Sequence, residues 1–157
     1  HWIFSIDLLD KQDFSIKLNM HVTKDIVDKH VNGSLTVIWR NYDDLIKNPP
    51  KMVYVSSVNP GETKGPHLHI KRSSYFTCIH GRVVFILKNL DGKYIEIESS
   101  EENGMMVFVP KNVASAHINL SNETSQILAL ADIAWRENDD EMKDVTFEDY
   151  NWKKWKK

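Results

Sequence analysis

Cysteine and long apolar runs are what this sequence of 157 residues has least of: it contains one cysteine, Cys78, and no stretch long enough to span a membrane. A single cysteine excludes a disulfide within the chain and fits a reducing compartment. No signal peptide is visible, so we expect a cytoplasmic protein. Cys78 alternates with apolar neighbours in an expected strand, which predicts a buried, unreactive thiol.

The sequence also lacks a large excess of either positive or negative charge. Twenty Lys and Arg against 22 Asp and Glu give a net charge of -2, and no basic stripe follows the sequence. This balance argues against a general nucleic-acid binder. Residues 152–157 form a short cationic end, which we interpret as solvated rather than as a membrane contact. With 41% hydrophobic residues, the chain has enough apolar material for one domain with a buried core.

Long helical periodicity is missing as well. Short apolar or alternating segments recur instead, with turn residues between them, and a further hairpin turn is expected at Asn32-Gly33. We expect strands at residues 2–6, 14–18, 34–39, 52–56, 67–70, 75–80, 83–88, 93–98, 105–109, 116–120 and 126–131. Only residues 23–28 and 42–47 are expected to turn helically. This spacing favours an all-β protein, either an antiparallel barrel or a double-sheet sandwich.

Two histidines stand out against this background. His67 and His69 are separated by one residue, so in a strand both side chains point to the same face while Leu68 points to the other. Two imidazoles on one face can meet a small ligand or a metal together. The pair therefore marks the candidate site.

The surrounding residues resemble the first motif of the cupins, G-x5-H-x-H-x(3,4)-E-x6-G. Gly61, the histidine pair and Gly81 occur at the motif's spacings, and Ser74 stands where the motif has glutamate. The second cupin motif is matched more loosely: Gly104 and Pro110 fit, Asn112 replaces a glycine, and His117 comes two residues late. The order and separation of the two motifs imply a cupin jelly roll.

Within the cupins, the chain resembles the dTDP-4-dehydrorhamnose 3,5-epimerases and the sugar-nucleotide 3,4-ketoisomerases. Residues 64–67 resemble the epimerase R-G-x-H, with Lys64 in place of arginine, and residues 109–117 resemble its P-x-G-x-x-H. The H-x-H pair is closer to the ketoisomerases. The resemblance implies a single domain, with extra N-terminal strands in residues 1–51, a cupin core in 52–135, and an acidic then basic segment in 136–157. It also implies a nucleotide-sugar substrate and a homodimer.

The chemistry implied is removal of a proton beside a sugar ketone, without a cofactor. Histidine suits this because its ordinary pKa of about 6.5 leaves much of it neutral. His67 is the candidate base, and His69 and His117 could assist it. The epimerases place a tyrosine acid in the strand that corresponds to residues 129–135, which has none here, so Tyr75 is the nearest available phenol.

Other residues complete the expected site. Positive charges for a diphosphate would come from Lys64, Lys71, Arg72 and Arg82. Asn119 lies on the same strand face as His117. In the epimerases an acidic ending supplies a carboxylate that orients the base, and Glu148 or Asp149 matches that place.

Two alternatives remain open at the level of the sequence. In a metal-dependent cupin, an oxygenase or isomerase, His67, His69 and His117 would be the ligands of a transition metal. Ser74 stands where such cupins have the glutamate that binds the metal, so this chain lacks the usual anionic ligand. A non-catalytic sugar-binding cupin is the other alternative, because a fold does not fix a function.

Overall fold

The computed structural model describes residues 14–43 and 49–156, which contain twelve β-strands, a short 3₁₀ helix and no α-helix. The strands are β1 (Ser15–Lys17), β2 (Met20–Lys24), β3 (Val31–Thr36), β4 (Met52–Val58), β5 (Thr63–His69), β6 (Ser74–His80), β7 (Arg82–Lys88), β8 (Tyr94–Ser100), β9 (Met105–Val109), β10 (Ala114–Asn119), β11 (Ser125–Ala131) and β12 (Met142–Asp144). The helix η3 (Trp152–Trp155) lies near the end of the chain. None of the helices in the described ranges has the length and apolar character needed to cross a membrane.

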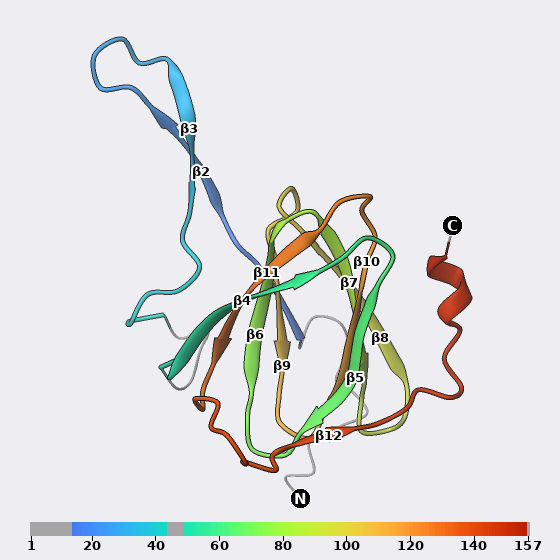
Figure 1. The fold of residues 1–157 in the computed structure, drawn as a ribbon. Helices are drawn as coiled ribbons and strands as arrows, with labels where there is room; N and C mark the ends of the chain where they lie inside the picture. Colours follow the sequence, from blue (N-terminus) through green and yellow to red (C-terminus); the bar gives the residue numbers. More distant parts are fainter. Residues whose placement is uncertain (1–13, 44–48, 157) are drawn as a thin grey trace, which may run out of the picture.

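Two antiparallel five-stranded sheets face each other and enclose the core (Figure 1). Their strand orders are β1-β9-β6-β11-β4 and β12-β5-β10-β7-β8. The crossing of consecutive strands between the two sheets is that of a jelly roll. The all-β cupin jelly roll expected from the sequence is confirmed.

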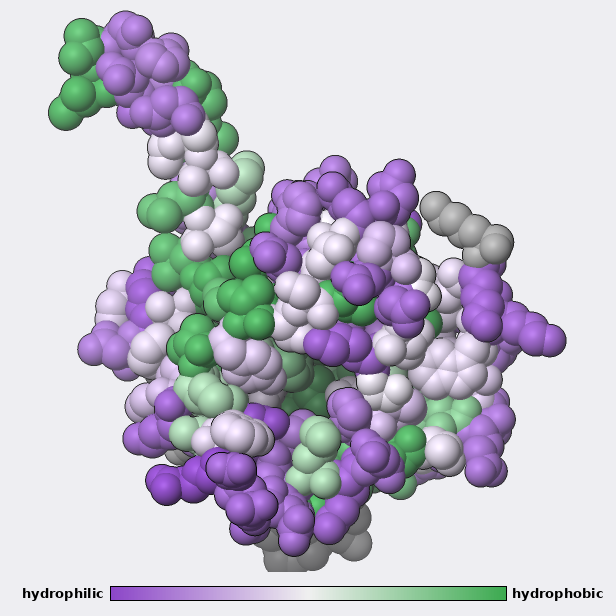
Figure 2. All heavy atoms as spheres, viewed as in Figure 1, coloured by the Kyte–Doolittle hydropathy of each residue, from purple (hydrophilic) through white to green (hydrophobic). Residues whose placement is uncertain are grey.

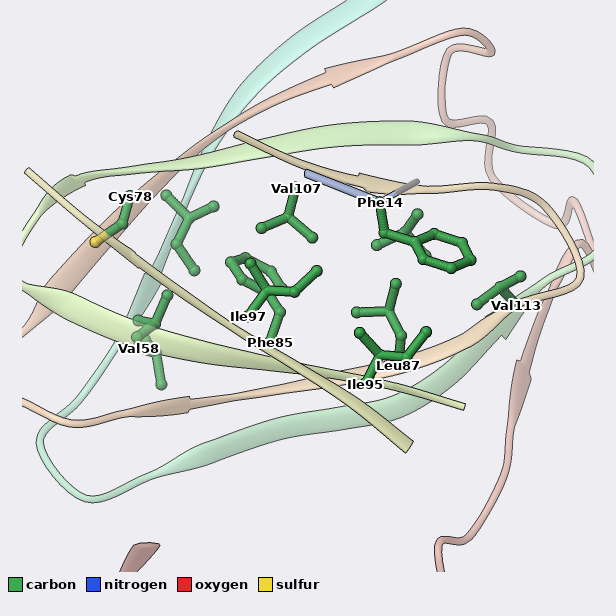
Figure 3. Packing of buried hydrophobic residues seen from close by; sticks show 12 residues of the cluster. Phe14, Val58, Cys78, Phe85, Leu87, Ile95, Ile97, Val107 and Val113 are labelled. Carbon is green, nitrogen blue, oxygen red and sulfur yellow. The ribbon is translucent and has the colours of Figure 1, made fainter. Parts of the chain in front are cut away.

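Strand β7 shows why the sheets close in this way. Its five central residues, 83–87, are all apolar and all buried, as expected of a strand covered on both faces. Phe85 and Leu87 point into the space between the sheets (Figure 3), and with Val83 they belong to the main core cluster. Val84 and Ile86 point outward and lie under the C-terminal segment. The chain's last residues therefore cover the outer face of the second sheet.

The β2–β3 hairpin projects away from the barrel (Figure 1). Here the local predictions were wrong. The turn lies at residues 25–30, where Asp25 Oδ1 accepts a hydrogen bond from the Val27 N–H (2.8 Å), and Gly33 pairs with Thr23 inside the ladder. The helical turn expected at residues 23–28 is this hairpin tip. The strand expected at residues 2–6, and most of the helical segment expected at 42–47, lie outside the described residues.

Strand β12 is short and polar, and no strand was expected there. It pairs antiparallel with β5, so that Asp144 lies opposite His67 and Met142 opposite His69. A backbone hydrogen bond from the Ile70 N–H to the Glu141 carbonyl (2.8 Å) extends this pairing by one step. The acidic C-terminal segment is thereby brought beside the histidine pair.

Candidate active site

A cavity of about 200 Å³ opens between the two sheets, and His67 and His69 both line it. The two side chains share one face of β5, as the alternation predicted. Later strands add His117 from β10 and Phe76 from β6. The two sequence motifs thus meet in one place, as the cupin resemblance implied.

His69 is held by a buried carboxylate. Its Nδ1 lies 2.6 Å from Oε1 of Glu141, whose side chain is 9% exposed, and Arg72 Nη2 lies 3.5 Å from the same oxygen. Burial lowers the pKa of His69, and the carboxylate of Glu141 only partly opposes this. The imidazole is therefore neutral at pH 7. Because a carboxylate can only accept, Nδ1 carries the proton and Nε2 keeps its lone pair.

His67 has a looser and more solvated partner. Its Nδ1 lies 3.3 Å from Oδ1 of Asp144, and the two side chains are 40% and 89% exposed. Each histidine of the pair thus has its own carboxylate, and both carboxylates come from the segment around β12. The two imidazoles differ in solvation, because His69 and Glu141 are largely buried whereas His67 and Asp144 are exposed to solvent.

His117 lies deepest of the three. Its ring packs against Phe85, with ring centroids 5.2 Å apart, and its Nε2 is buried without a hydrogen-bond partner among the described residues. Burial, together with the nearby charges of Lys64 and His67, lowers the pKa of His117 to about 4. It is a neutral imidazole at pH 7. A buried polar atom without a partner is unusual in a folded protein, and it marks this histidine of the cavity lining as a candidate for a functional role.

Tyr54 is a site residue that the sequence analysis missed. It lies on β4 and lines the cavity, whereas its neighbours Val53 and Val55 point outward and are 58% and 51% exposed. Burial raises the pKa of Tyr54, so the phenol keeps its proton. The alternation of residues 52–58 puts Tyr54 on the face opposite Val53 and Val55, but it does not say which of the two faces is inside.

Tyr75, the phenol expected to serve as the acid, lies elsewhere. Its ring stacks on Phe108 with centroids 4.6 Å apart, and it packs with a separate cluster that includes Met106 and Leu130. On β6 the residues that reach the cavity are its neighbours, Ser74 and Phe76. The phenol nearest the histidines is Tyr54.

The expected basic residues divide into two groups. Lys64 and Arg72 line the cavity, and Lys64 Nζ donates to Ser56 Oγ (2.7 Å) and to the Ser57 carbonyl (3.1 Å). Lys71 points to solvent, where it lies 3.5 Å from Asp139. Arg82 lies 3.5 Å from Glu98, in a different hollow of the surface.

Asn119, expected to face the cavity beside His117, is committed to the fold. Its Nδ2 donates to the carbonyls of Val58 (2.9 Å) and Glu123 (2.7 Å), and its Oδ1 accepts from Ser125 Oγ (2.8 Å). These bonds tie the end of β10 to the neighbouring strands.

The carboxylates beside the histidines are Glu141 and Asp144, not Glu148 and Asp149. Asp149 accepts a hydrogen bond from the Tyr94 hydroxyl, and Glu148 lies 3.5 Å from Thr146 Oγ1. Both belong to the stretch that packs on the outer face of the second sheet. The expected type of residue is present, but it comes from earlier in the acidic segment.

A metal site made of His67, His69 and His117 would need the three ligand atoms close together. Among the described residues, two groups of three potential ligands lie within 4.8 Å of one another: Asp25, Asp28 and His30; and His80, Glu101 and Glu123. Neither includes a histidine of the cavity. Moreover, Nδ1 of each member of the histidine pair lies beside a carboxylate. The three imidazoles are not arranged as a ready ligand set for a metal.

Comparison with known proteins adds an independent finding. The family model described as FdtA: WxcM-like, C-terminal matches residues 16–152. A search of curated proteins found no match to the sequence.

Solved structures share the fold. A dTDP sugar isomerase from Desulfovibrio desulfuricans superposes with a TM-score of 0.72 at 15% identity, covering 85% of this chain and 83% of that one. The sugar 3,4-ketoisomerase QdtA from Thermoanaerobacterium thermosaccharolyticum, solved in complex with TDP, gives 0.60 at 25% identity and covers 81% and 87%. A dTDP-4-dehydrorhamnose 3,5-epimerase from Elizabethkingia anophelis gives 0.66 at 20% identity and covers 85% and 74%.

Proposed function

The chain belongs to the family described as FdtA: WxcM-like, C-terminal, and on that premise we propose that it is a sugar-nucleotide isomerase acting on a dTDP-linked 4-keto-6-deoxy sugar. The observation that carries this proposal is the pair of histidines in one cavity, each with a carboxylate of its own. Similarity to QdtA supports the substrate class, because that protein is a sugar ketoisomerase solved with TDP.

The reaction begins with loss of the proton on C3, next to the C4 ketone. His67 is our candidate base, since a carboxylate on Nδ1 leaves Nε2 free to accept the proton. The electrons of the broken C–H bond move to O4 and give an enediolate. Arg72 and Lys64 stabilise its negative charge. Tyr54, whose pKa is raised by burial, is the candidate donor of a proton to O4.

Two outcomes are open to the enediolate. If a proton returns to C3 on the opposite face, the sugar is epimerised. If O3 loses its proton while C4 gains one, the ketone moves to C3 and the sugar is a 3,4-ketoisomer of the substrate. A second neutral imidazole on the same face, His69, favours the second outcome, because its free Nε2 can take the proton from O3 and pass it to C4 while His67 holds the one from C3.

The cavity suits the sugar rather than the whole substrate. Its volume of about 200 Å³ is below the roughly 300–1,000 Å³ usual for ligand pockets. We therefore assign the hexose to the cavity and the nucleotide to its mouth.

We also propose a homodimer. Strand β4 is an edge of its sheet and exposes Val53 and Val55, and the projecting hairpin exposes Val22 and Leu35. In Figure 2 this apolar surface continues from the hairpin to the barrel beside it. A second copy of the chain would cover both.

The test of the proposed activity is hydrogen exchange. Incubation with a dTDP-4-keto-6-deoxy sugar in heavy water should place deuterium on a carbon beside the ketone. His67→Asn should slow this about a hundredfold or more, the scale of losing a general base. His80→Asn is the matched control, since His80 is half-exposed and pairs with Glu123 outside the cavity. Equal exchange in parent and His67→Asn would remove His67 from the mechanism, and no exchange in the parent would favour a binding protein.

A further inference from the structure

A large hollow on the described surface lies on the other side of the second sheet from the catalytic cavity. After β12 the chain crosses the outer face of this sheet and ends in η3, which stands beside the barrel (Figure 1). Between η3 and the sheet is a groove of about 610 Å³. Its apolar lining comes from Ile118, Leu120, Trp152 and Trp155. We call this hollow the outer groove.

A second hollow adjoins the outer groove. It measures about 520 Å³ and shares Thr63, Trp152 and Lys156 with it. Its other lining residues include the apolar Pro66, Val145 and Phe147, together with the carboxylate of Glu148. Trp152 and Lys156 therefore stand where the two hollows meet.

The outer groove carries positive charge. Arg82, Lys154 and Lys156 line it, against one carboxylate, Glu98. Arg82 lies 3.5 Å from Glu98, and Lys154 lies 2.8 Å from Glu96 behind the helix. The ammonium group of Lys156 has no ion pair among the described residues. Of the three cations, Lys156 is thus the one left without a carboxylate partner among the described residues, and an ammonium group of this kind binds phosphate.

The wall formed by η3 is fixed in place. Trp155 Nε1 donates to the Tyr150 hydroxyl (2.6 Å), and that hydroxyl donates to Glu96, which also binds Lys154. Trp152 stacks on Phe147 with ring centroids 6.0 Å apart. A pre-formed wall costs a ligand little ordering entropy, which distinguishes the groove from a loose terminal segment.

We propose that the outer groove is a second ligand site, for a nucleoside phosphate. The base would lie in the second hollow against Trp152 and Phe147, and the phosphates would lie in the outer groove within reach of Lys156 and Arg82. Indole faces bind planar rings, and Lys and Arg bind phosphate oxygens. The site is separated from the catalytic cavity by the sheet itself, so this proposal does not depend on the proposed isomerase activity.

The test uses ADP carrying an N-methylanthraniloyl group, whose absorption overlaps tryptophan emission. ADP has the same phosphates as dTDP but a different base, which reduces binding at the mouth of the catalytic cavity. We expect saturable energy transfer at low salt, weakened by 0.5 M salt because the contacts are ionic. Lys156→Glu should weaken binding about tenfold or more, the scale of one charged hydrogen bond. Lys153→Glu, three residues earlier in η3 but outside both hollows, should change it less than twofold.

The His67→Asn protein distinguishes binding in the outer groove from binding at the catalytic cavity. Binding that survives His67→Asn and is weakened by Lys156→Glu alone supports the outer groove. Three results would overturn the proposal: no saturable binding, equal losses in the Lys153→Glu and Lys156→Glu proteins, or binding lost in His67→Asn and kept in Lys156→Glu. Unlabelled ADP must displace the probe, since binding through the fluorophore alone also counts against a nucleotide site.

Discussion

Glu141 reaches His69 across 72 residues of sequence, with Oε1 2.6 Å from Nδ1, and both side chains are largely buried. The contact exists because β12 pairs with β5 and brings the acidic segment beside the histidines. A buried carboxylate on one ring nitrogen fixes both the tautomer and the orientation of the imidazole. Of the two histidine–carboxylate pairs, this one is the more rigid.

Glu141→Gln should therefore impair catalysis more than binding. The amide keeps the shape of the carboxylate but no longer fixes the proton on Nδ1, and it leaves Arg72 without its anionic partner. We expect the rate of deuterium incorporation to fall about ten- to a hundredfold, within the range of general acid–base effects. Glu148→Gln, an exposed carboxylate of the same segment, is the control. Equal rates in the two variants would mean that Glu141 does not orient His69.

Tyr54 and Tyr75 provide a sharper comparison, because they differ in the face they occupy. Tyr54→Phe removes the phenol that lines the cavity, whereas Tyr75→Phe removes one that stacks on Phe108. We expect Tyr54→Phe to lower kcat about a hundredfold with little change in unfolding temperature. Tyr75→Phe should keep nearly full activity. The reverse pattern, measured by product formation with a 4-keto sugar nucleotide, would restore Tyr75 as the acid.

The sequence could predict the strands of the barrel, from β4 to β11, because each is an apolar or alternating segment bounded by turn residues. It also brought His67, His69 and His117 together through two motifs. It could not select Tyr54, because alternation says which residues share a face but not which face is inside. The exposure of Val53 and Val55 decides that, and it becomes visible only when β4 pairs with β11.

The orienting carboxylates show a different limit. Strand β12 is three residues long, Met-Lys-Asp, and has no hydrophobic pattern of its own. Its position follows from pairing with β5, which is a long-range contact that local sequence does not encode. At the hairpin, two local signals competed: Asn32-Gly33 favoured a tight turn, but the Asp25 side chain caps a longer turn before it.

His117 predicts a loss of stability in mild acid. Its pKa is about 4 in the fold and about 6.5 in the unfolded chain, so the unfolded state binds more protons between those values. The stabilisation is complete above pH 6.5 and is lost as the pH falls toward 4. Between pH 7.5 and 5.0 this histidine alone should remove about 2 kcal/mol from the free energy of unfolding.

Denaturant unfolding at the two pH values measures this effect, with His117→Leu as the comparison. The leucine variant has no imidazole at this position, so its stability should fall by about 2 kcal/mol less than that of the parent over the same interval. Subtracting the change measured for the variant from that of the parent removes the contribution of the carboxylates, which also titrate in this range. Equal pH dependence in parent and variant would show that His117 is protonated as easily in the fold as outside it.

The proposed dimer predicts that charge on the β4 edge separates the copies. Replacing Val53 and Val55 by lysine puts two buried charges into the interface, and like charges from both copies would meet there. Leu90→Lys is the control, because Leu90 is 60% exposed in the turn between β7 and β8. Light scattering at micromolar concentration should give the mass of two chains for the parent and the control, and of one chain for the double variant. A parent protein with the mass of one chain would contradict the proposed dimer. A double variant that stays dimeric would instead move the interface away from β4 to another surface.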